Sequence, residues 1–451
     1  MKVNAKTIWI VLLNLLTTGA IAGSLPNPLR TADPSGVLGT YSTNGAIDVT
    51  NPFFQSLGAN GRTCNSCHVS STAWTISPPE VQSRFNATNG TDPIFRTVDG
   101  ANCPSADVST VAARRAAYSQ LLSKGLLRIS LAVPANADFQ IIGISDPYNC
   151  AETTASQPAM FRRPLPSTNL PFATTVMWDG RESPAGQSLT ANLTSQANDA
   201  TLGHAQAAHA PTAAQLAAIV KFEIAIFTAQ FSDTNAGSVT AQGASGGPLN
   251  LSRQNFFPGI NDVFGADPTG APFNESAFNI YDAWQNSPSP VRASVARGEQ
   301  LFNTFPIPIT GVAGVNDMLG QETVMGTCTT CHDSPNVGNH SLPLGLNIGI
   351  TDYPGRPGLD ISGLPVYTIQ CNAGGAPIQT TDPGRALVTG RCADVGKTKG
   401  PVLRGLAARA PYFHNGSAAT LRNVVDFYDA RFSLGLTEQQ KQDLVAFLKT
   451  L

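Results

Sequence analysis

Cys64-Asn65-Ser66-Cys67-His68 is the stretch that decides how this chain is interpreted, and Cys328-Thr329-Thr330-Cys331-His332 repeats its pattern. Two thiols one helical turn apart can each form a thioether with a haem vinyl group, and the adjacent histidine then lies under the ring as an iron ligand. A zinc knuckle would need more Cys or His nearby, and a thioredoxin-like redox pair does not need the histidine. Two complete motifs therefore predict two covalently attached c-type haems.

The amino terminus has the pattern of a secretory signal. Lys2 and Lys6 precede the apolar run Ile8–Leu16, and Ala20-Ile21-Ala22 matches a cleavage site. The run is short for a membrane span, and an uncleaved anchor is the alternative. Because no other stretch could cross a bilayer, we expect residues 1–22 to be a cleaved signal peptide and the mature protein to be periplasmic.

The composition excludes one large class of partners. Charged residues make up 13% of the chain, and the formal net charge is −2. Nucleic-acid binding needs clustered Lys and Arg, and a polybasic membrane anchor needs a run of them. Neither pattern occurs, so we expect no nucleic acid as a partner and no stable membrane span in the mature chain.

Export also affects how the remaining cysteines are interpreted, because an oxidising compartment favours disulfides. The cysteines outside the haem motifs are Cys103, Cys150, Cys371 and Cys392. Their proximity in the sequence predicts two local bridges, 103–150 and 371–392.

Helical patterns dominate the regular part of the chain. Apolar residues recur at helical spacing over Val108–Leu122, Thr212–Gln230 and Val291–Phe302. A final helix begins with a capping box formed by Thr437 and Gln440. Strand signals are few and short, while 41 Gly and 33 Pro imply long irregular loops. The expected fold class is therefore mostly α with extensive loops.

The wide separation of the two haem motifs suggests one haem in each of two domains. The stretch 286–290 (NSPSP) has the composition of a boundary. We therefore expect an amino-terminal haem domain over 23–287 and a carboxy-terminal haem domain over 288–451. A stretch rich in Gly, Ser, Ala and Thr, 235–247, is expected to be a surface loop of the first domain.

Further segments point to a known family. They are Met177-Trp178-Asp179-Gly180-Arg181, Gly400-Pro401-Val402-Leu403-Arg404-Gly405, and Ala410-Pro411-Tyr412-Phe413-His414-Asn415-Gly416-Ser417. Together with Val424–Tyr428 and the two haem motifs, they resemble the bacterial di-haem cytochrome c peroxidase and MauG superfamily. The regions 75–170 and 235–290 match no motif of that superfamily.

The resemblance implies a fold, a set of cofactors and a peroxidase-type activity. The superfamily fold is two cytochrome-c-like helical domains whose haems face each other across an interface, commonly with a Ca²⁺ ion between them. The sequence shows no ligand set for calcium. Trp178 matches the tryptophan that passes electrons between the haems, and Arg181 belongs to the same element. The alternative for Trp178 is a buried core aromatic, and a homodimer is compatible with the resemblance.

The second haem lacks the methionine ligand of an electron-transfer haem, because no Met follows His332. In the peroxidases resembled here, that Met lies fourteen residues after the histidine that matches His414, and here the position holds Tyr428. The MauG branch has a tyrosine ligand at this position, and an anionic phenolate stabilises oxidised iron. His340 and His414 are competing ligands, although His414 is expected to hydrogen-bond near a haem propionate. A surface position is the other interpretation of Tyr428.

The first haem lacks a nearby distal histidine, since no His occurs between His68 and His204. Its iron is therefore expected to be five-coordinate or water-bound, and open to peroxide or O₂. Cleavage of an O–O bond also needs a group that transfers a proton. The glutamate of the superfamily corresponds to Gln206, which cannot act as a base, so His204 is a candidate for that role or for iron ligation. His209 and Glu182 are weaker candidates.

These observations predict a periplasmic di-haem oxidoreductase of the peroxidase type. Peroxide or O₂ would react at the first haem, and Trp178 would share oxidising equivalents with the second. Electrons would come from a small redox protein, a protein substrate or an organic molecule. The alternative is a non-catalytic electron carrier with two six-coordinate irons, the first ligated by His204, Met160 or Met177. A lesser alternative is a haem protein that assembles with a respiratory partner.

Overall fold

The computed structural model describes residues 23–451, so the predicted signal peptide lies outside the described residues. The α-helices are α1 (Pro78–Thr88), α2 (Val111–Ala117), α3 (Ser119–Lys124), α4 (Leu189–Gly203), α5 (Ala213–Ala225), α6 (Pro248–Leu251), α7 (Pro290–Thr304), α8 (Asn316–Leu319), α9 (Ala386–Thr389), α10 (Leu421–Phe432) and α11 (Glu438–Lys449). The strands are β1 (Ser24–Leu25), β2 (Leu29–Asp33), β3 (Gly36–Ser42), β4 (Ile47–Asp48), β5 (Leu127–Ser130), β6 (Phe139–Ser145), β7 (Ala159–Arg162), β8 (Ile226–Asp233), β9 (Gly237–Ser238), β10 (Ile307–Thr310), β11 (Thr323–Gly326), β12 (Gly345–Leu346), β13 (Val366–Cys371), β14 (Ile378–Thr380) and β15 (Thr398–Lys399).

The prediction of a mostly α fold made of two cytochrome-c-like helical domains is wrong. Within residues 23–451, 30% of the residues are helical and 16% are in strands or bridges, and the chain forms eleven α-helices and several small sheets. The strands are short and pair with segments that are often distant in sequence. Strand formation depends on such partners more than on local periodicity, so helical spacing within one window does not reveal them.

Two of the predicted helices have different bounds in the structure. The helix expected over Thr212–Gln230 ends early, because α5 stops at Ala225. The β-branched and aromatic residues Ile226-Phe227-Thr228 follow, and they open β8, which pairs with β3. The helix expected over Val108–Leu122 is divided into α2 and α3, which meet at Tyr118.

The helices near the carboxy terminus are confirmed. The predicted segment Val291–Phe302 lies within α7, and α11 follows the predicted capping box of Thr437 and Gln440. The two helices approach most closely at Gly298, where an added Cβ would lie 2.0 Å from the carbonyl oxygen of Asp443. A side chain at this position of α7 would therefore separate the helices.

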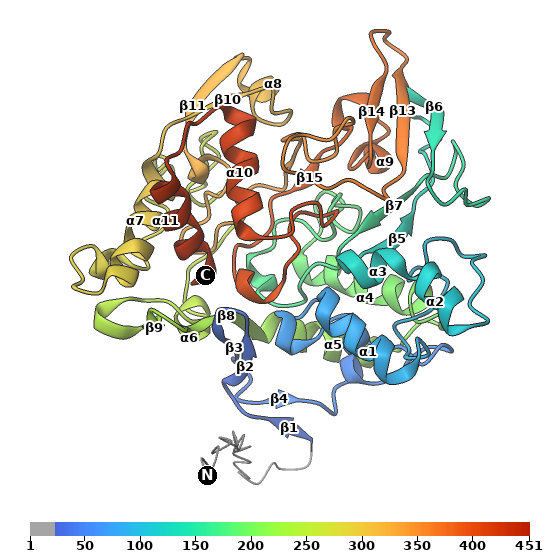
Figure 1. Ribbon diagram of the computed structural model, residues 1–451, viewed down its shortest axis with the longest axis horizontal. Coiled ribbons are helices and arrows are strands. Elements are labelled where there is room, and N and C mark those ends of the chain that lie inside the picture. The colour runs from blue at the N-terminus through green and yellow to red at the C-terminus, as the bar shows by residue number, and fades with distance from the viewer. Residues whose placement is uncertain (1–22) are drawn as a thin grey trace, which may run out of the picture.

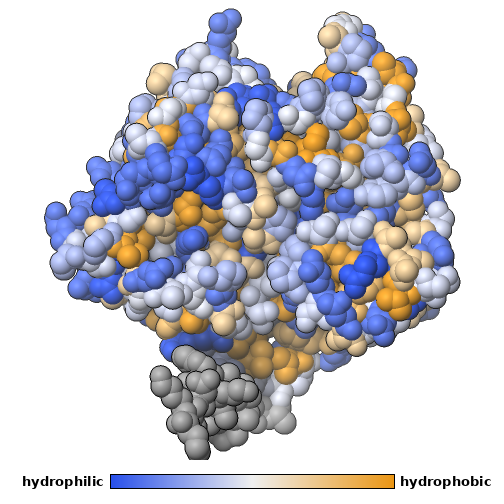
Figure 2. Space-filling model, in the orientation of Figure 1, coloured by the Kyte–Doolittle hydropathy of each residue, from blue (hydrophilic) through white to orange (hydrophobic). Residues whose placement is uncertain are grey.

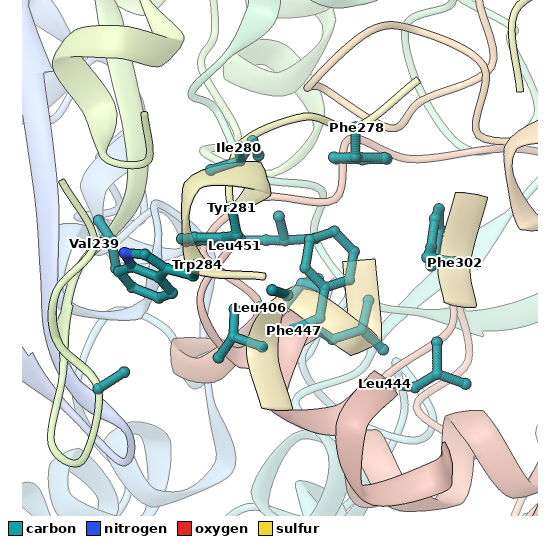
Figure 3. Close-up of a cluster of buried hydrophobic side chains, with 14 of the residues drawn as sticks. Val239, Phe278, Ile280, Tyr281, Trp284, Phe302, Leu406, Leu444, Phe447 and Leu451 are labelled. Carbon is teal, nitrogen blue, oxygen red and sulfur yellow. The ribbon is translucent and has the colours of Figure 1, made fainter. Parts of the chain in front are cut away.

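The largest hydrophobic cluster packs beside these two helices. Tyr281 and Trp284, which precede α7, lie within it together with side chains from α7 and α11 (Figure 3). The carboxy terminus completes the cluster, because Leu451 is buried and its carbonyl oxygen accepts hydrogen bonds from the backbone N–H groups of Gln230 and Gly405. Strand β8 and the segment after β15 are thereby joined to the carboxy-terminal helices.

The prediction of a surface loop over 235–247 holds only in part. Ala236, Val239 and Ala244 are buried in the same hydrophobic cluster, and the segment contains the short strand β9. The small residues of this stretch allow it to pack closely against the hydrophobic cluster, and it is not a solvated loop throughout.

Small antiparallel sheets connect distant parts of the chain. One has the strand order β2-β3-β8-β9, and another has the order β14-β13-β6. In Figure 1, helices α1 to α5 lie together on one side, α7, α10 and α11 lie on the other, and the β13–β14 hairpin projects from the edge. The pairing of β6 with β13 joins the two predicted domains, whose boundary stays a prediction.

Both predicted disulfides are confirmed. Cys103 is bonded to Cys150 with a Cα–Cα distance of 5.4 Å, and Cys371 is bonded to Cys392 at 5.7 Å. The second bridge ties the end of β13 to the segment after α9. The cysteines of the two haem motifs take no part in disulfides.

The surface mixes polar and apolar side chains. Figure 2 shows one face with interspersed patches of both kinds and a hollow between the projecting β13–β14 hairpin and the opposite side of the molecule. Among residues 23–451, no helix combines the length and the apolar character that a membrane crossing requires.

Candidate functional site

The two Cys-x-x-Cys-His motifs form the same local structure. Cys64 begins a short 3₁₀ turn in which its carbonyl oxygen accepts a 3.0 Å hydrogen bond from the N–H of His68. The Cys328 carbonyl likewise accepts a 3.1 Å hydrogen bond from the N–H of His332. Each turn is closed by a hydroxyl side chain: the N–H of Thr63 donates to Ser66 at 3.0 Å, and its counterpart Thr327 donates to Thr330 at 2.9 Å.

Both motif histidines are held in the same tautomer. The Nδ1 atom of His68 lies 3.0 Å from the carbonyl oxygen of Trp74, and that of His332 lies 2.6 Å from the carbonyl oxygen of Gly338. A carbonyl can only accept, so Nδ1 carries the proton and Nε2 keeps its lone pair. Burial lowers the pKa of His68 to about 4 and also lowers the pKa of His332. Both imidazoles are therefore neutral and keep a free Nε2.

Each motif lies on the wall of its own cavity. Cys64, Cys67 and His68 line the first cavity, which has a volume of about 200 Å³. Cys328, Cys331 and His332 line the second, of about 230 Å³. Burial raises the pKa of Cys67 to about 11 and that of the other three thiols to about 12, so all four are neutral thiols before any reaction. No group of three or more His, Cys, Asp or Glu side chains arranged to hold a metal ion occurs in the described part of the chain.

The two cavities have one wall in common. The residues that line both cavities, called the shared wall here, are Arg163, Pro164, Pro166, Trp178, Lys399, Pro401 and Arg409. They come from two segments that are far apart in the sequence, one on each side of the predicted domain boundary. The shared wall therefore brings the two motif-bearing cavities next to each other.

Trp178 is fixed in the shared wall by a hydrogen bond and an aromatic contact. Its indole Nε1 donates to the carbonyl oxygen of Arg163 at 2.7 Å. Its ring meets the His414 ring edge to face, with centroids 6.0 Å apart. An aromatic ring that contacts both cavities in a fixed orientation is suited to carry an electron between them.

A chain of buried ion pairs supports the Trp178 loop. Arg162 lies 2.5 Å from Asp179 and 2.7 Å from Asp382, and Arg181 lies 3.0 Å from Asp179. Burial opposes the charge on both acids, but the guanidinium of Arg162 lowers the pKa of Asp179 and of Asp382. Arg181 also lines the first cavity, so its ion pair with Asp179 connects the wall of that cavity to the Trp178 loop.

Four cations that line the cavities, called the unpaired cations here, have no acidic partner. Arg163 and Arg404 are buried, and Lys399 and Arg409 are half-buried. Arg163, Lys399, Arg404 and Arg409 form no ion pair with a carboxylate anywhere in residues 23–451, and their recorded hydrogen bonds go to backbone carbonyls. Burial lowers the pKa of Lys399 to about 8, of Arg163 to about 9, and of Arg404 and Arg409 to about 10. Buried charges are normally paired, so these four fit an anionic group bound in the cavities.

Tyr428 and His414 line the second cavity, whereas His340 does not. Burial raises the pKa of Tyr428 well above its usual value, and its side chain packs against Phe413, Phe427 and Phe432. Tyr428 is therefore not a surface residue. His340 is directed to Asp333 instead, with Nδ1 3.1 Å from the carboxylate, while His414 lies 3.4 Å from Asp382.

Of the four residues predicted as candidates for proton transfer at the first haem, one lines the first cavity and three lie outside it. His204 lines the cavity, whereas Gln206, Glu182 and His209 do not. Gln206 accepts a hydrogen bond from Asn60 at 3.1 Å at the surface, and Glu182 accepts one from Ser195 at 2.9 Å.

Glu223 is a cavity residue that sequence reasoning did not find. It lies on α5, lines the first cavity and is 5% exposed, and its Oε2 atom has no hydrogen-bond partner in the described structure. Burial raises its pKa to about 8. The available signal was a glutamate among the apolar residues Phe222, Ile224 and Ala225, because Glu is seldom fully buried without a partner.

Comparison with known proteins gives local similarities, and no family model matches the chain. It is 30% identical over 192 residues to cytochrome-c peroxidase IdrP1 of Denitromonas iodatirespirans, a match covering 38% of this chain and 44% of that protein. It is 42% identical over 79 residues to cytochrome c551 peroxidase of Nitrosomonas europaea, covering 17% of this chain and 23% of that protein. The chain thus spans less than half the length of these curated relatives.

A solved structure of a MauG-like protein associated with microbial copper homeostasis aligns with 95% of this chain and 94% of its own, at 18% identity and a TM-score of 0.40. That likeness is too distant to bear on the fold or on the site.

Proposed function

We propose that this chain, which is similar over part of its length to cytochrome c peroxidases, is an exported di-haem oxidoreductase of the cytochrome c peroxidase and MauG type that uses peroxide or O₂. The first cavity is the reaction site, and the second holds a redox partner centre. The electron donor is a small redox protein, a protein substrate or an organic molecule.

The observation that carries the proposal is the shared wall. Two cavities, each with a Cys-x-x-Cys-His motif on its wall, meet at Trp178. A protein that only stored haem would not need an aromatic side chain fixed between the cavities. The ion pairs around Asp179 keep the loop of Trp178 in place, and exclusion of water from this wall strengthens them.

The residues present fit two c-type haems. The thiols of each motif lie one turn apart on a cavity wall, and each histidine presents a free Nε2. The four unpaired cations would hold the propionate carboxylates, and the propionates would supply the anionic partners that the polypeptide does not provide. When bound, haem supplies an iron that accepts and releases electrons and that can bind a small oxygen-containing molecule.

The two cavities would play different parts because different side chains line them. Tyr428, which lines the second cavity, would offer a phenolic oxygen to the second haem as a ligand, and such a ligand would favour the oxidised metal. The first cavity is lined by His204 and Glu223, both of which can bind a proton. Proton transfer is needed where an O–O bond breaks, so the reaction belongs in the first cavity.

Spectroscopy of the purified protein tests the proposal. A pyridine haemochrome assay is expected to give two haems per chain. Ferric electron paramagnetic resonance is expected to show one high-spin and one low-spin haem, and adding hydrogen peroxide should change the optical spectrum at stoichiometric concentration. Two low-spin haems that do not respond to peroxide would contradict the proposal and favour the electron carrier.

A further inference from the structure

His204 lies at the end of α4 in an arrangement that orients its ring. Its Nδ1 atom is 2.5 Å from the Oδ2 atom of Asp99, a residue more than one hundred positions earlier in the chain. The ring lines the first cavity, and its side chain is 39% exposed. Because the Asp99 carboxylate accepts from Nδ1, the Nε2 atom of His204 is left with its lone pair.

Asp99 is itself fixed by a buried arginine. It is 4% exposed, and its Oδ1 atom forms an ion pair with Arg62 at 2.6 Å. Burial opposes ionisation of Asp99, but the hydrogen bond from His204 and the charge of Arg62 lower the pKa of its carboxyl. The Nε and Nη2 atoms of Arg62 donate to the carbonyl oxygens of Pro93 and Ile94, which fixes the orientation of the guanidinium.

The backbone of His204 is held by Arg62 and by the neighbouring Asn60. Its carbonyl oxygen accepts hydrogen bonds from the Arg62 guanidinium at 3.1 Å and from the Asn60 side chain at 2.8 Å. The two segments pack so closely that a Cβ on Gly58 would lie 1.9 Å from the carbonyl oxygen of Ala205. Arg62 therefore fixes both the backbone of His204 and the carboxylate that orients its ring.

The other candidates for proton transfer are either not held in one orientation by a hydrogen bond or do not line the first cavity. Glu223 has an unpartnered oxygen and accepts no hydrogen bond within the described structure. Gln206 and Glu182 lie outside the cavity wall. Among these candidates for proton transfer in residues 23–451, only His204 combines a place on the wall with a defined orientation.

We infer that His204 is the proton-transfer residue of the first cavity and that Asp99, held by Arg62, is its positioning residue. This inference rests on the proposed function. Nε2 of His204 takes a proton from one oxygen of hydrogen peroxide and returns it to the other, which leaves as water when the O–O bond breaks. The full reduction consumes two further protons from solvent and two electrons from the donor and yields two waters.

Cyanide binding to the ferric holoprotein tests this inference without measuring turnover. Hydrogen cyanide must lose its proton to bind iron as cyanide, so a base in the cavity speeds its association. We expect His204→Gln to slow association by roughly 100-fold or more. Asp99→Asn is expected to slow it by roughly 10- to 100-fold, as for other residues that orient a reactive histidine.

Matched controls separate positioning from folding. His209→Gln changes an exposed histidine away from the cavity. Asp443→Asn removes the ion pair between buried Asp443 and half-exposed Arg297, neither of which lines the first cavity. Both should keep the wild-type association rate. The ferric spectrum of Asp99→Asn should stay close to that of the wild type, because the asparagine preserves the shape of the side chain. Its Tm is expected to fall, because the buried Arg62 loses its acidic partner, so association rates are compared at a temperature where every variant is folded.

Three results would overturn the inference. Asp99→Asn could bind cyanide at the wild-type rate, or His204→Gln could do so. Alternatively, His204→Gln could convert a low-spin first haem to high spin, which would make His204 an iron ligand. The proposed function fails separately, when the wild-type protein itself does not respond to peroxide.

Discussion

At the scale of single residues, one backbone carbonyl at each motif decides which imidazole nitrogen is free. The carbonyls of Trp74 and Gly338 occupy the same position relative to His68 and His332, six residues later in each case. The Cys-x-x-Cys-His motif identifies the histidine, but it does not determine which ring nitrogen carries the proton. The loop that returns to Nδ1 supplies that information, and it is the same in both halves of the chain.

Tyr428 provides a test of the second cavity. Its hydroxyl is buried with a raised pKa, so the phenolate that would bind iron needs the charge of the metal to form. We expect Tyr428→Phe to change the low-spin signature of one haem and to raise its midpoint potential, measured by electron paramagnetic resonance and potentiometric titration. Tyr353→Phe, at an exposed position, is the control. An unchanged low-spin signature in Tyr428→Phe would exclude the ligand.

Substitution of Lys399 tests whether the unpaired cations hold the haem propionates. Its ammonium lies in the shared wall and donates to the carbonyl oxygen of Thr175 at 2.6 Å. A positive charge favours the reduced form of a nearby haem, so Lys399→Met should lower both midpoint potentials by roughly several tens of millivolts. Lys221→Met removes an exposed charge on α5 and should leave the potentials unchanged. A shift in neither haem would show that Lys399 does not face the cofactors.

At the scale of elements, the strands explain why the expected fold class was wrong. The apolar spacing of Thr212–Gln230 predicts one helix, but β3 offers a pairing partner to the residues after Ala225. The competing partner is almost two hundred residues away, so no local window contains it. The capped helices α7 and α11 were predictable because their caps and apolar faces are local.

The close approach of α7 and α11 predicts a stability change. Gly298→Ala places a methyl group against the Asp443 carbonyl, so it should lower the free energy of unfolding by about 1–3 kcal/mol. Urea denaturation followed by circular dichroism measures the change. Gly203→Ala, at a helical position with open space around it, should be neutral or stabilising. Equal effects of the two substitutions would contradict the packing argument.

At the scale of the whole molecule, Glu223 links stability to pH. Its pKa is about 8 in the folded protein against 4.5 for the ordinary group, so the folded state keeps a proton that the unfolded state loses. The free energy of unfolding should therefore fall as pH rises from about 4.5 to about 8.

Glu223→Gln removes this titration. The decrease in the free energy of unfolding between pH 5 and pH 8, measured by urea denaturation of the holoprotein, should be smaller in the variant than in the wild type. Glu275→Gln, at an exposed position, should retain the wild-type decrease. If Glu223→Gln also retained it, the buried carboxyl would not be the group responsible.

The sequence by itself determined the features that depend on neighbouring residues. The two haem motifs, the capping box of Thr437 and Gln440, both disulfide pairings and the family resemblance can each be recognised from short segments or close spacing. Tyr428 could be proposed as a ligand from its position in a motif, and the structure places it on the cavity wall.

Only the tertiary structure decided which residues meet across long separations. The ion pair of Asp99 with Arg62, its bond to His204, the burial of Glu223 and the wall shared by the two cavities have no local signature. The physical reason is that hydrogen bonds, ion pairs and burial depend on distance in space. Chain connectivity determines that distance only for residues close in sequence.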